Sequence, residues 1–394
     1  MSEFKSPNFR NEDGSAAPDI VGVTTFTSPY YFVPPSGTTA ERPSGDGLAP
    51  GMLRFNTDIG RLEVWRNDHW ATILGESPNL GNQNAAAGSS AAGTGARGVF
   101  AGGYIPGGTG DRSTIDYITI STLGNAISFG SLTNARRGFD GCGSATRGVM
   151  SGGAGVNDGG DTRVQDFITY ASTGTCTSFG NLDFGRESGK CCSSSTRGMH
   201  CGGGNSPAPF TNVMNYFTIA TTGSSQDFGD LTFTTNSSAS MSSPVRGIFQ
   251  ANGPSPGGSG SRNNIDFWTI STTGNATSFG ELSGDYYSKA AAGNATRGIF
   301  GSIINPSATN TLEFITISST GNGQDFGDLD VPYSSANAVS SPTRYVIGSG
   351  ESPSNPNDLM SYVTIATTGN GINFGDLTEG RFSPAACSNA HGGL

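Results

Sequence analysis

The sequence predicts an all-β protein built from repeated sheets, and two observations lead to that prediction. Of 394 residues, 61 are glycine and only 13% are charged, about half the ~25% charged share usual in globular domains. This composition excludes helical bundles, coiled coils and doubly wound enzymes, whose helices are rich in Ala, Leu, Glu and Lys. The second observation is an internal repeat, in which three sequence markers recur in phase at intervals near 50 residues.

The markers are short and regular. The first is T-R-G or a close variant, and its arginine recurs at spacings of 50, 50, 49, 51 and 47 residues. The second is F-G-x-L, and the third is a β-branched and aromatic run between them, such as residues 115–120. The arginines are Arg97, Arg147, Arg197, Arg246, Arg297 and Arg344, and the F-G-x-L phenylalanines are Phe129, Phe179, Phe228, Phe279, Phe326 and Phe374.

Each repeat contains four strand signals in a fixed order. Strand one is small and polar, as in residues 141–144, and strand two follows the arginine, as in residues 98–103. Strand three is the aromatic run, and strand four carries F-G-x-L. The turn between three and four is S-T-T-G-N or a variant, which suits residues with positive φ. Units of four antiparallel strands and about 48 residues are typical of β-propeller blades.

The small residues of strand one fit this architecture, because innermost strands crowd around the axis of a propeller. Cys142, Cys192 and Cys387 occupy that slot, and we interpret them as packing residues. The chain's six cysteines have no metal-type spacing and no signal peptide precedes them, so we expect buried thiols rather than a disulfide framework. We expect each repeated arginine to bind a neighbouring backbone carbonyl and tie the blades together, with a functional cluster as the alternative.

The last repeat unit indicates how the ring closes. Residues 385–390 match the strand-one sequence at 290–295, but no unit follows them. Because a propeller must hide its sheet edges, we expect this strand to pair into the first blade, which gives six blades. In the alternative, residues 51–74 form strands of a divergent seventh blade, 85–88 is another strand one, and the last strand completes that blade.

The repeat resembles the kelch repeat. In kelch units an inner strand ends near an arginine, the next strand ends in Gly-Gly, and the fourth carries a large aromatic residue. Gly102-Gly103 matches the double glycine, and the F-G-x-L phenylalanine stands where kelch units carry Trp. The pair is lost at Ala251-Asn252-Gly253 and at Ser349-Gly350. The resemblance covers residues 84–394 and implies an architecture but no activity, because propellers host many functions.

The first 83 residues have a different character. Residues 1–50 contain Pro-punctuated extended stretches that cannot bury much surface alone, so we expect an arm lying on another chain. Residues 51–83 predict a small β-meander and a linker. Trp65 and Trp70 offer apolar surface to a neighbouring subunit, with packing against the propeller as the plain alternative. The predicted assembly contacts are Trp65, Trp70, Tyr30, Tyr31 and Phe32.

One segment of this region resembles a module of bacteriophage proteins. Glu41-Arg42-Pro43 is followed by Gly51-Met52-Leu53-Arg54-Phe55-Asn56-Thr57-Asp58 and then by strands carrying Trp65 and Trp70. This pattern is similar to one in tail-fibre and other virion proteins of tailed phages, cyanophages included, and covers about 40 residues. The resemblance implies a location in the virion, in a tail fibre, neck or other surface appendage, after synthesis in the host cytoplasm.

The resemblance also implies partners. The arm would bind other virion proteins, the chain would form a homo-oligomer, and the propeller would face outward toward a host glycan or receptor. Two other classes remain open at this point. One is a soluble kelch-like lectin or adaptor, and the other, the least supported, is a propeller oxidase.

Motifs for chemistry are scarce, so we expect no enzyme, no catalytic residue, no metal and no cofactor. His69, His200 and His391 are the chain's only histidines, and none lies in HExxH or at metal-pair spacing. Asn157–Asp161 could hold Ca²⁺, but an ordinary turn is the simpler interpretation. The net charge of −10 argues against nucleic acid binding. No apolar run of about 18 residues is present, so we expect no membrane insertion.

The loops between strands two and three are the predicted ligand-binding loops. They vary between repeats and would all emerge on one face of a rigid scaffold. Their Gly, Ser, Asn and Pro content suits adaptable polar contacts, for example with glycans. The loops span residues 104–113, 154–163, 204–211, 252–263, 302–310 and 350–358, and the candidate residues in them are Tyr104, Asp158, Phe210, Asn252, Asn305 and Asn355.

Overall fold

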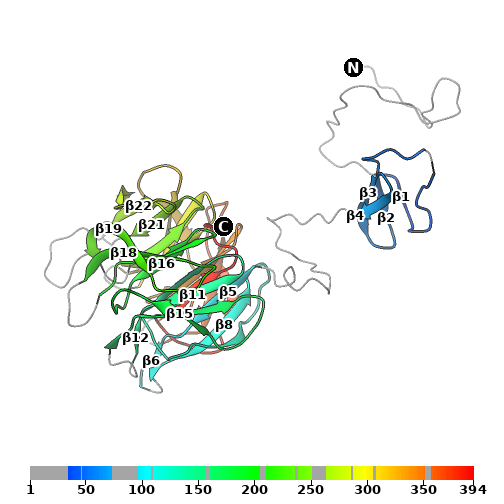
Figure 1. Ribbon diagram of the computed structural model, residues 1–394. Helices are drawn as coiled ribbons and strands as arrows, with labels where there is room; N and C mark the ends of the chain where they lie inside the picture. The colour runs from blue at the N-terminus through cyan, green and yellow to red at the C-terminus, as the bar shows by residue number, and fades with distance from the viewer. Residues whose placement is uncertain are drawn as a thin grey trace. The chain divides into compact units, whose positions relative to one another are not determined.

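The structure is a computed structural model, and its regular elements are β-strands (Figure 1). Two compact units divide the chain, Met1–Gly75 and Glu76–Leu394. The all-β prediction is confirmed for the described residues. None of the ranges that the structure describes contains a helix with the length and apolarity needed to cross a bilayer. The described residues are 34–45, 47–72, 96–107, 110–155, 160–204, 210–235, 238–250, 263–284, 287–304, 308–350 and 356–394.

The first unit contains one four-stranded sheet with the order β1-β2-β3-β4. Strands β2 (Leu53–Asn56), β3 (Arg61–Arg66) and β4 (His69–Thr72) form the antiparallel meander that the sequence predicts. Strand β1 (Ser36–Gly37) pairs with β2 in parallel. These two residues were expected to belong to an extended arm, but their backbone groups pair within the unit.

The second unit contains, within its described residues, six four-stranded antiparallel sheets, which we number sheet 1 to sheet 6. In each sheet the strands run from first to fourth in the predicted order. Sheet 1 is β32 (Ala385–Ser388), β5 (Arg97–Ala101), β8 (Thr114–Thr119) and β9 (Ile127–Ser131); sheet 2 is β10 (Asp140–Gly143), β11 (Arg147–Ser151), β14 (Val164–Thr169) and β15 (Thr177–Asn181); sheet 3 is β16 (Lys190–Ser193), β17 (Arg197–Cys201), β18 (Thr211–Thr218) and β19 (Gln226–Thr235).

The remaining sheets follow the same order, and two short hairpins extend the second strands of sheets 1 and 2. Sheet 4 is β20 (Ala239–Ser242), β21 (Arg246–Gln250), β22 (Asn264–Thr269) and β23 (Thr277–Glu281); sheet 5 is β24 (Tyr287–Gly293), β25 (Arg297–Ile304), β26 (Thr311–Thr316) and β27 (Gln324–Asp328); sheet 6 is β28 (Asn337–Ser340), β29 (Arg344–Gly348), β30 (Leu359–Thr364) and β31 (Ile372–Asp376); the hairpins are β6 (Tyr104–Ile105) with β7 (Gly110–Asp111) and β12 (Ala154–Gly155) with β13 (Gly160–Asp161).

Strand β32 joins the two ends of the repeat region. It pairs with β5 in antiparallel register, from Ala385 opposite Ala101 to Ser388 opposite Gly98. The predicted pairing of the last strand into the first repeat is therefore confirmed. The alternative paired it with residues 51–74, but strands β2 to β4 of that segment form their own sheet in the first unit. Residues 85–88 lie outside the described part of the chain.

The first strands of the six sheets contact one another in sequence. Strand β10 contacts β16, and the contacts continue through β20, β24, β28 and β32 back to β10. The central side chains of these strands are buried and, apart from one methionine, small, as predicted. They are Cys142, Cys192, Met241, Ala292, Val339 and Cys387.

In sheets 1, 2, 3 and 6 the second strand is followed by a pair of residues with positive φ, including one case where the double glycine is lost. Gly102 and Gly103 have φ of 60° and 108°. Ser349 and Gly350, which depart from the kelch-like pattern, have φ of 67° and 103°. The backbone shape is thus kept although an L-residue is strained there.

The F-G-x-L marker packs each sheet against the next. Phe179 in sheet 2 is 3% exposed, and the N–H of Gly223 in sheet 3 donates to its carbonyl at 2.8 Å. The same bond recurs between every consecutive pair of sheets and returns from Phe374 in sheet 6 to Gly124 in sheet 1. A Cβ on Gly180 would lie 2.2 Å from the Gly223 oxygen, so the marker needs glycine for close backbone approach.

We therefore expect Gly180→Ala to lower the free energy of unfolding by about 1–3 kcal/mol, the usual range for overpacking. Gly223→Ala is the matched control, because a Cβ there meets open space. Denaturant unfolding of both variants measures the difference. Equal midpoints would contradict the close contact between sheets.

Candidate functional site

Each repeated arginine joins two neighbouring sheets, as predicted. The guanidinium of Arg147 lies 4.3 Å from the ring centroid of Phe167 in its own sheet. Its Nη1 donates to the Ile219 carbonyl of the next sheet at 2.9 Å. Arg344 in sheet 6 donates to Ile120 in sheet 1 at 3.0 Å, so the series returns to its start. The other acceptors are the carbonyls of Tyr170, Ile270, Ile317 and Ile365, for Arg97, Arg197, Arg246 and Arg297 respectively.

A second set of arginines was missed by the sequence reasoning. Arg136, Arg186 and Arg381 have no exposed surface and are the largest fully buried side chains described. Arg136 pairs with Asp166 at 2.8 Å, and Arg381 pairs with Asp116 at 3.0 Å. The available signal was an arginine four residues before strand one, but it occurs in only three repeats.

In each sheet a side chain of the segment that leads into the sheet bonds to a side chain of the third strand. The acidic member of this pair, which faces the buried arginine where one is present, changes place between repeats. In sheet 2 it is Asp166 on the third strand, bound by Thr133 of the linker that enters the sheet, at 2.8 Å. In sheet 3 it is Asp183 of the linker, bound by Asn215 of the third strand at 3.1 Å. The third-strand side chain of every pair is buried, so we assign these pairs a structural role. The pairs are Thr378/Asp116, Thr133/Asp166, Asp183/Asn215, Thr232/Asp266, Ser283/Glu313 and Asp330/Ser361.

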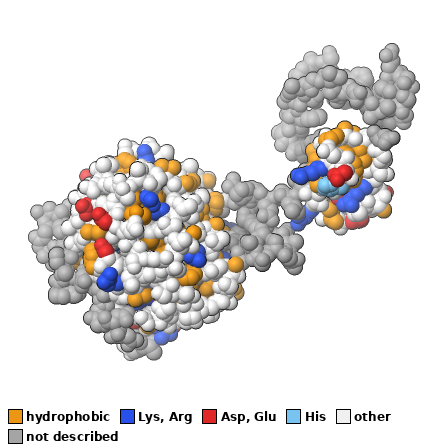
Figure 2. All heavy atoms as spheres, in the orientation of Figure 1, with side chains coloured by type: hydrophobic (Ala, Val, Ile, Leu, Met, Phe, Trp, Pro, Cys, Tyr) orange, Lys and Arg blue, Asp and Glu red, His pale blue; other side chains and the backbone are white. Residues whose placement is uncertain are grey.

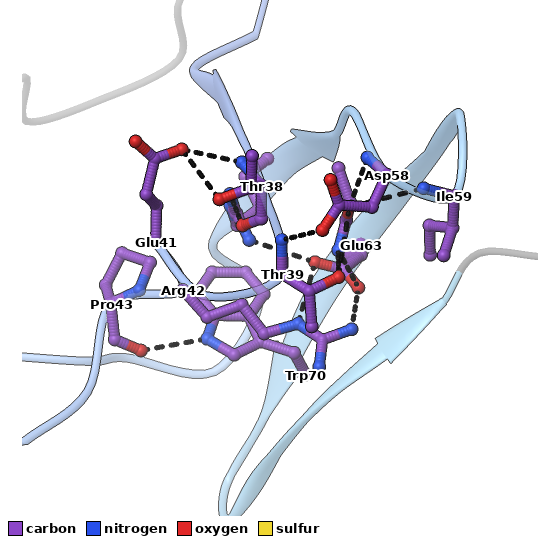
Figure 3. A network of polar contacts seen from close by, with 11 residues as sticks. Thr38, Thr39, Glu41, Arg42, Pro43, Asp58, Ile59, Glu63 and Trp70 are labelled. Carbon is purple, nitrogen blue, oxygen red and sulfur yellow. Dashed lines mark hydrogen bonds and ion pairs between the residues drawn. The ribbon is translucent and has the colours of Figure 1, made fainter.

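The first unit has a polar core made by the residues of its phage-like pattern (Figure 3). Glu63 has no exposed surface, and its carboxylate accepts bonds from Arg42 Nε and Arg54 Nη1, both at 3.2 Å, and from Asn56 Nδ2 at 3.1 Å. The bonds from Arg42 are the main cause that holds the pKa of Glu63 below its usual value. A strand pattern alone would have placed Glu63 in solvent.

The same network ties the turn of the pattern to the preceding segment. Asn56 Oδ1 accepts from the N–H of Asp58 at 3.0 Å, and Asp58 Oδ2 accepts from the N–H of Thr39 at 2.8 Å (Figure 3). Trp70 Nε1 donates to the Pro43 carbonyl at 3.0 Å. The E-R-P and R-F-N-T-D residues thus form one connected structure.

Apolar side chains on the surface of this unit suit a partner. Met52, Leu53 and Ile59 are 42%, 48% and 43% exposed, and apolar atoms gather on one side of the unit in Figure 2. The rings of Trp65 and Trp70 contact each other at a tilt of 59°, with centroids 5.5 Å apart. Trp70 also lines an open groove of about 630 Å³. A domain this small with a polar core is marginal alone. Tyr30, Tyr31 and Phe32 lie outside the described residues.

The predicted ligand-binding loops follow the second strand of each sheet. Because the first and second strands are antiparallel, these loops begin beside the linker that leads into the first strand. In sheet 2, for example, Ser151 lies opposite Asp140. The ring of Tyr104 packs edge-to-face on that of Phe382, with centroids 5.2 Å apart. The guanidinium carbon of Arg137 lies 4.8 Å from the centroid of the Tyr104 ring. Phe210 lies against Gly204. Asp158, Asn252, Asn305 and Asn355 lie outside the described residues, as do positions 157–159 of the calcium alternative.

The surface of the second unit carries few charges. Figure 2 shows a face made mostly of uncharged atoms with isolated basic and acidic side chains. Several described charges on the loop-bearing face are paired with each other, such as Arg112 with Glu379 and Arg137 with Asp111. This surface suits hydrogen bonding to a polar ligand more than binding to a highly charged polymer.

The first strands surround a central cavity of about 50 Å³. Residues 391–394 pack across one end of it. There His391 Nε2 donates to the Gly143 carbonyl at 2.8 Å, and Nδ1 accepts from the N–H of Gly393 at 3.1 Å. Burial lowers the pKa of His391, so these bonds fit its neutral form. The cavity has room for only a few water molecules.

The cysteine thiols and His200 of the second unit are buried. All six cysteines are free and buried, and burial raises the pKa of Cys176 and Cys387 to about 12, so these thiols are poor nucleophiles. Cys191 Sγ lies 3.4 Å from His200 Nδ1, a contact not expected from the sequence. Burial raises the pKa of Cys191 and lowers that of His200. In the described ranges no three His, Cys, Asp or Glu residues could hold a metal.

The buried His200 gives a testable pH dependence. Burial and then the Arg186 charge hold its pKa well below the usual 6.5. The unfolded chain therefore binds a proton below about pH 6.5 that the folded chain does not, and stability falls as the pH drops, by up to about 1.4 kcal/mol per pH unit.

His200→Met, which copies Met150 of the preceding repeat, should remove this contribution and leave that of His391. Urea unfolding between pH 4.5 and 7.5 measures both slopes. An unchanged slope in His200→Met would contradict the assignment.

Comparison with known proteins adds no relative, since no protein-family model matches the chain and no curated protein matches it.

Proposed function

We propose that this chain is a non-enzymatic structural protein of a tailed-phage particle, part of a tail fibre or similar appendage. The N-terminal part anchors the chain to other virion proteins and to copies of itself. The second unit is displayed outward, and its loop-bearing face binds a glycan or receptor on the host surface.

The observation that carries this proposal is the buried network of the first unit. Its members Arg42, Arg54, Asn56 and Asp58 belong to the pattern that resembles phage virion modules, and they join around Glu63. Residues of a sequence pattern that bind one another in a single network are less easily a coincidence of composition. The exposed apolar residues of the same unit supply the surface that attachment needs.

The architecture we propose for the second unit is a closed, kelch-like propeller of six blades, one for each sheet. Three series of contacts support it, namely the first-strand contacts, the arginine–carbonyl bonds and the F-G-x-L bonds. Each series runs through sheets 1 to 6 and returns to sheet 1. A ring of this kind leaves no open inner edge.

The test is incorporation into particles. Particles purified on a density gradient should contain the full-length chain, and a chain lacking residues 1–83 should be absent while its sheets remain folded by circular dichroism. Full-length chain missing from pure particles would overturn the proposal, as would incorporation that does not need residues 1–83.

A second candidate, a free lectin-like binding module, is favoured by the loop-bearing face alone. It predicts that the full chain and the chain lacking residues 1–83 bind the same glycans with equal affinity and that neither enters particles. A glycan array read beside the particle assay separates the two candidates.

A further inference from the structure

Lys190 is a buried lysine whose charge the described residues do not neutralise. It is 8% exposed, although lysines are almost never this buried unless they are paired. Among the residues that the structure describes, no hydrogen bond or ion pair of the Lys190 ammonium is found. The nearby carboxylate of Asp140 accepts bonds from Asn337 Nδ2 at 2.8 Å and from the Cys191 N–H at 2.9 Å instead.

The fold itself does not require a lysine at this position. The other repeats carry Asp140, Ala239, Ala290, Asn337 and Ala385 as the equivalent strand-one residue. The Lys190 ammonium is not among the fully buried polar atoms that lack a partner, so it reaches solvent-accessible space without a hydrogen-bond partner. A ligand of opposite charge would supply the missing partner.

Lys190 lines a cavity of about 40 Å³ at the mouth of the central channel, opposite the end covered by His391. The rim comes from four consecutive sheets, with Ser335, Ser383, Gly138 and Ser188 in order. These residues have φ of 58°, 55°, 62° and 59°. Backbone hydrogen bonds join these residues along the rim. The N–H of Ser383 donates to the Ser335 carbonyl at 2.8 Å, and the N–H of Gly138 donates to the Ser383 carbonyl at 3.1 Å.

The cavity lies on the loop-bearing face. It forms where the linkers enter the first strands, and the second strands deliver the variable loops at that same side. Its volume admits one small group and excludes a whole sugar ring. The chemistry that fits a single ammonium with hydroxyls on the rim is a monoanion such as a carboxylate.

We propose that Lys190 and the serine rim bind one carboxylate group, supplied by an acidic sugar of the host surface. Anion binding follows from the cavity and from the ammonium that has no partner. The sugar as its source rests on the proposed function, since it is the loops around the rim that would hold the remainder of the ligand.

The test titrates the full-length protein with D-glucuronate, with glucose as the neutral control and with acetate as the free carboxylate, by calorimetry at constant ionic strength. We expect glucuronate and acetate to bind and glucose not to bind. Lys190→Met should weaken the binding of glucuronate and of acetate by about 10-fold to 100-fold, the range for loss of a hydrogen bond to a charged group. Arg163→Met is the matched control, because it removes an exposed positive charge outside the cavity lining.

The outcomes separate the two parts of the proposal. Unchanged affinity in Lys190→Met, or no binding of either carboxylate, overturns the anion site. Acetate binding that depends on Lys190 without glucuronate binding supports the anion site and overturns the sugar as its source. Lys190→Ala, which copies Ala239 and Ala385, should fold at least as well as the native chain. Because particle incorporation is measured separately, its failure would not be confused with failure of this site.

Discussion

A chain ending at Pro384, without β32, is expected to lose the cooperative fold of its second unit. Strand β32 supplies the first strand of sheet 1 by pairing with β5. It also lies between β28 and β10 in the series of first-strand contacts. Its removal leaves the inner edge of β5 unpaired and uncovers Val99 and Phe100, both fully buried. An open sheet edge beside uncovered apolar residues favours aggregation.

The control is a chain ending at Ala390, which keeps β32 and loses only residues 391–394. We expect this shorter truncation to stay soluble and folded, with a lower melting temperature because the bonds of His391 are lost. Soluble yield, circular dichroism and hydrogen exchange of β5 and β8 distinguish the two chains. Native-like melting of the chain ending at Pro384 would contradict the proposed closed ring.

Replacing Asp166 with Asn is expected to lower the free energy of unfolding by about 3–5 kcal/mol, the usual loss when one partner of a buried ion pair is removed. Arg136 would keep its charge with no exposed surface and without its carboxylate. The loss comes from that stranded charge more than from the missing contact itself.

Asp266→Asn is the matched control, because Asp266 occupies the equivalent position with Thr232 as partner. Burial raises the pKa of Asp266, so the folded chain binds its proton more tightly than the unfolded chain does. The ionised form therefore weakens the fold as the pH rises, and at pH 7 the substitution should be neutral or stabilising. Equal losses in both variants would contradict the role of the arginine.

The arrangement in sheet 3 offers a rescue. Thr133→Asp combined with Asp166→Asn would place the carboxylate on the linker, as Asp183 and Asn215 do beside Arg186. We expect the double variant to recover most of the lost stability. A double variant as unstable as Asp166→Asn alone would show that the two placements of the carboxylate are not equivalent.

The sequence predicted the repeat, the order of four strands and the pairing of the last strand into the first repeat. It also predicted the arginine ties between repeats, with a functional cluster as the alternative, because one arginine recurs in each repeat at nearly constant spacing. These features depend on neighbours in the chain or on an exact period, which a single sequence displays directly.

The buried ion pairs and the Lys190 cavity could not be predicted in the same way. The carboxylate of a pair moves between Asp166 and Asp183 from one repeat to the next, because stability depends on the charge being present in that space and not on which strand carries it. Ser36 and Gly37 read as an extended arm because a two-residue strand has no periodic pattern. Their place beside β2 depends on backbone bonds and on the Arg54 contact with Thr38 at 2.9 Å.

For this protein, the sequence by itself determined the β-strands, their repeat and the small residues of the first strands, since alternation and period are local properties of the chain. Only the tertiary structure decided which charges are buried together, which end of the channel His391 covers and where Lys190 is left unpaired. Those features depend on segments far apart in the sequence meeting in space, where burial strengthens every paired charge and penalises every unpaired one.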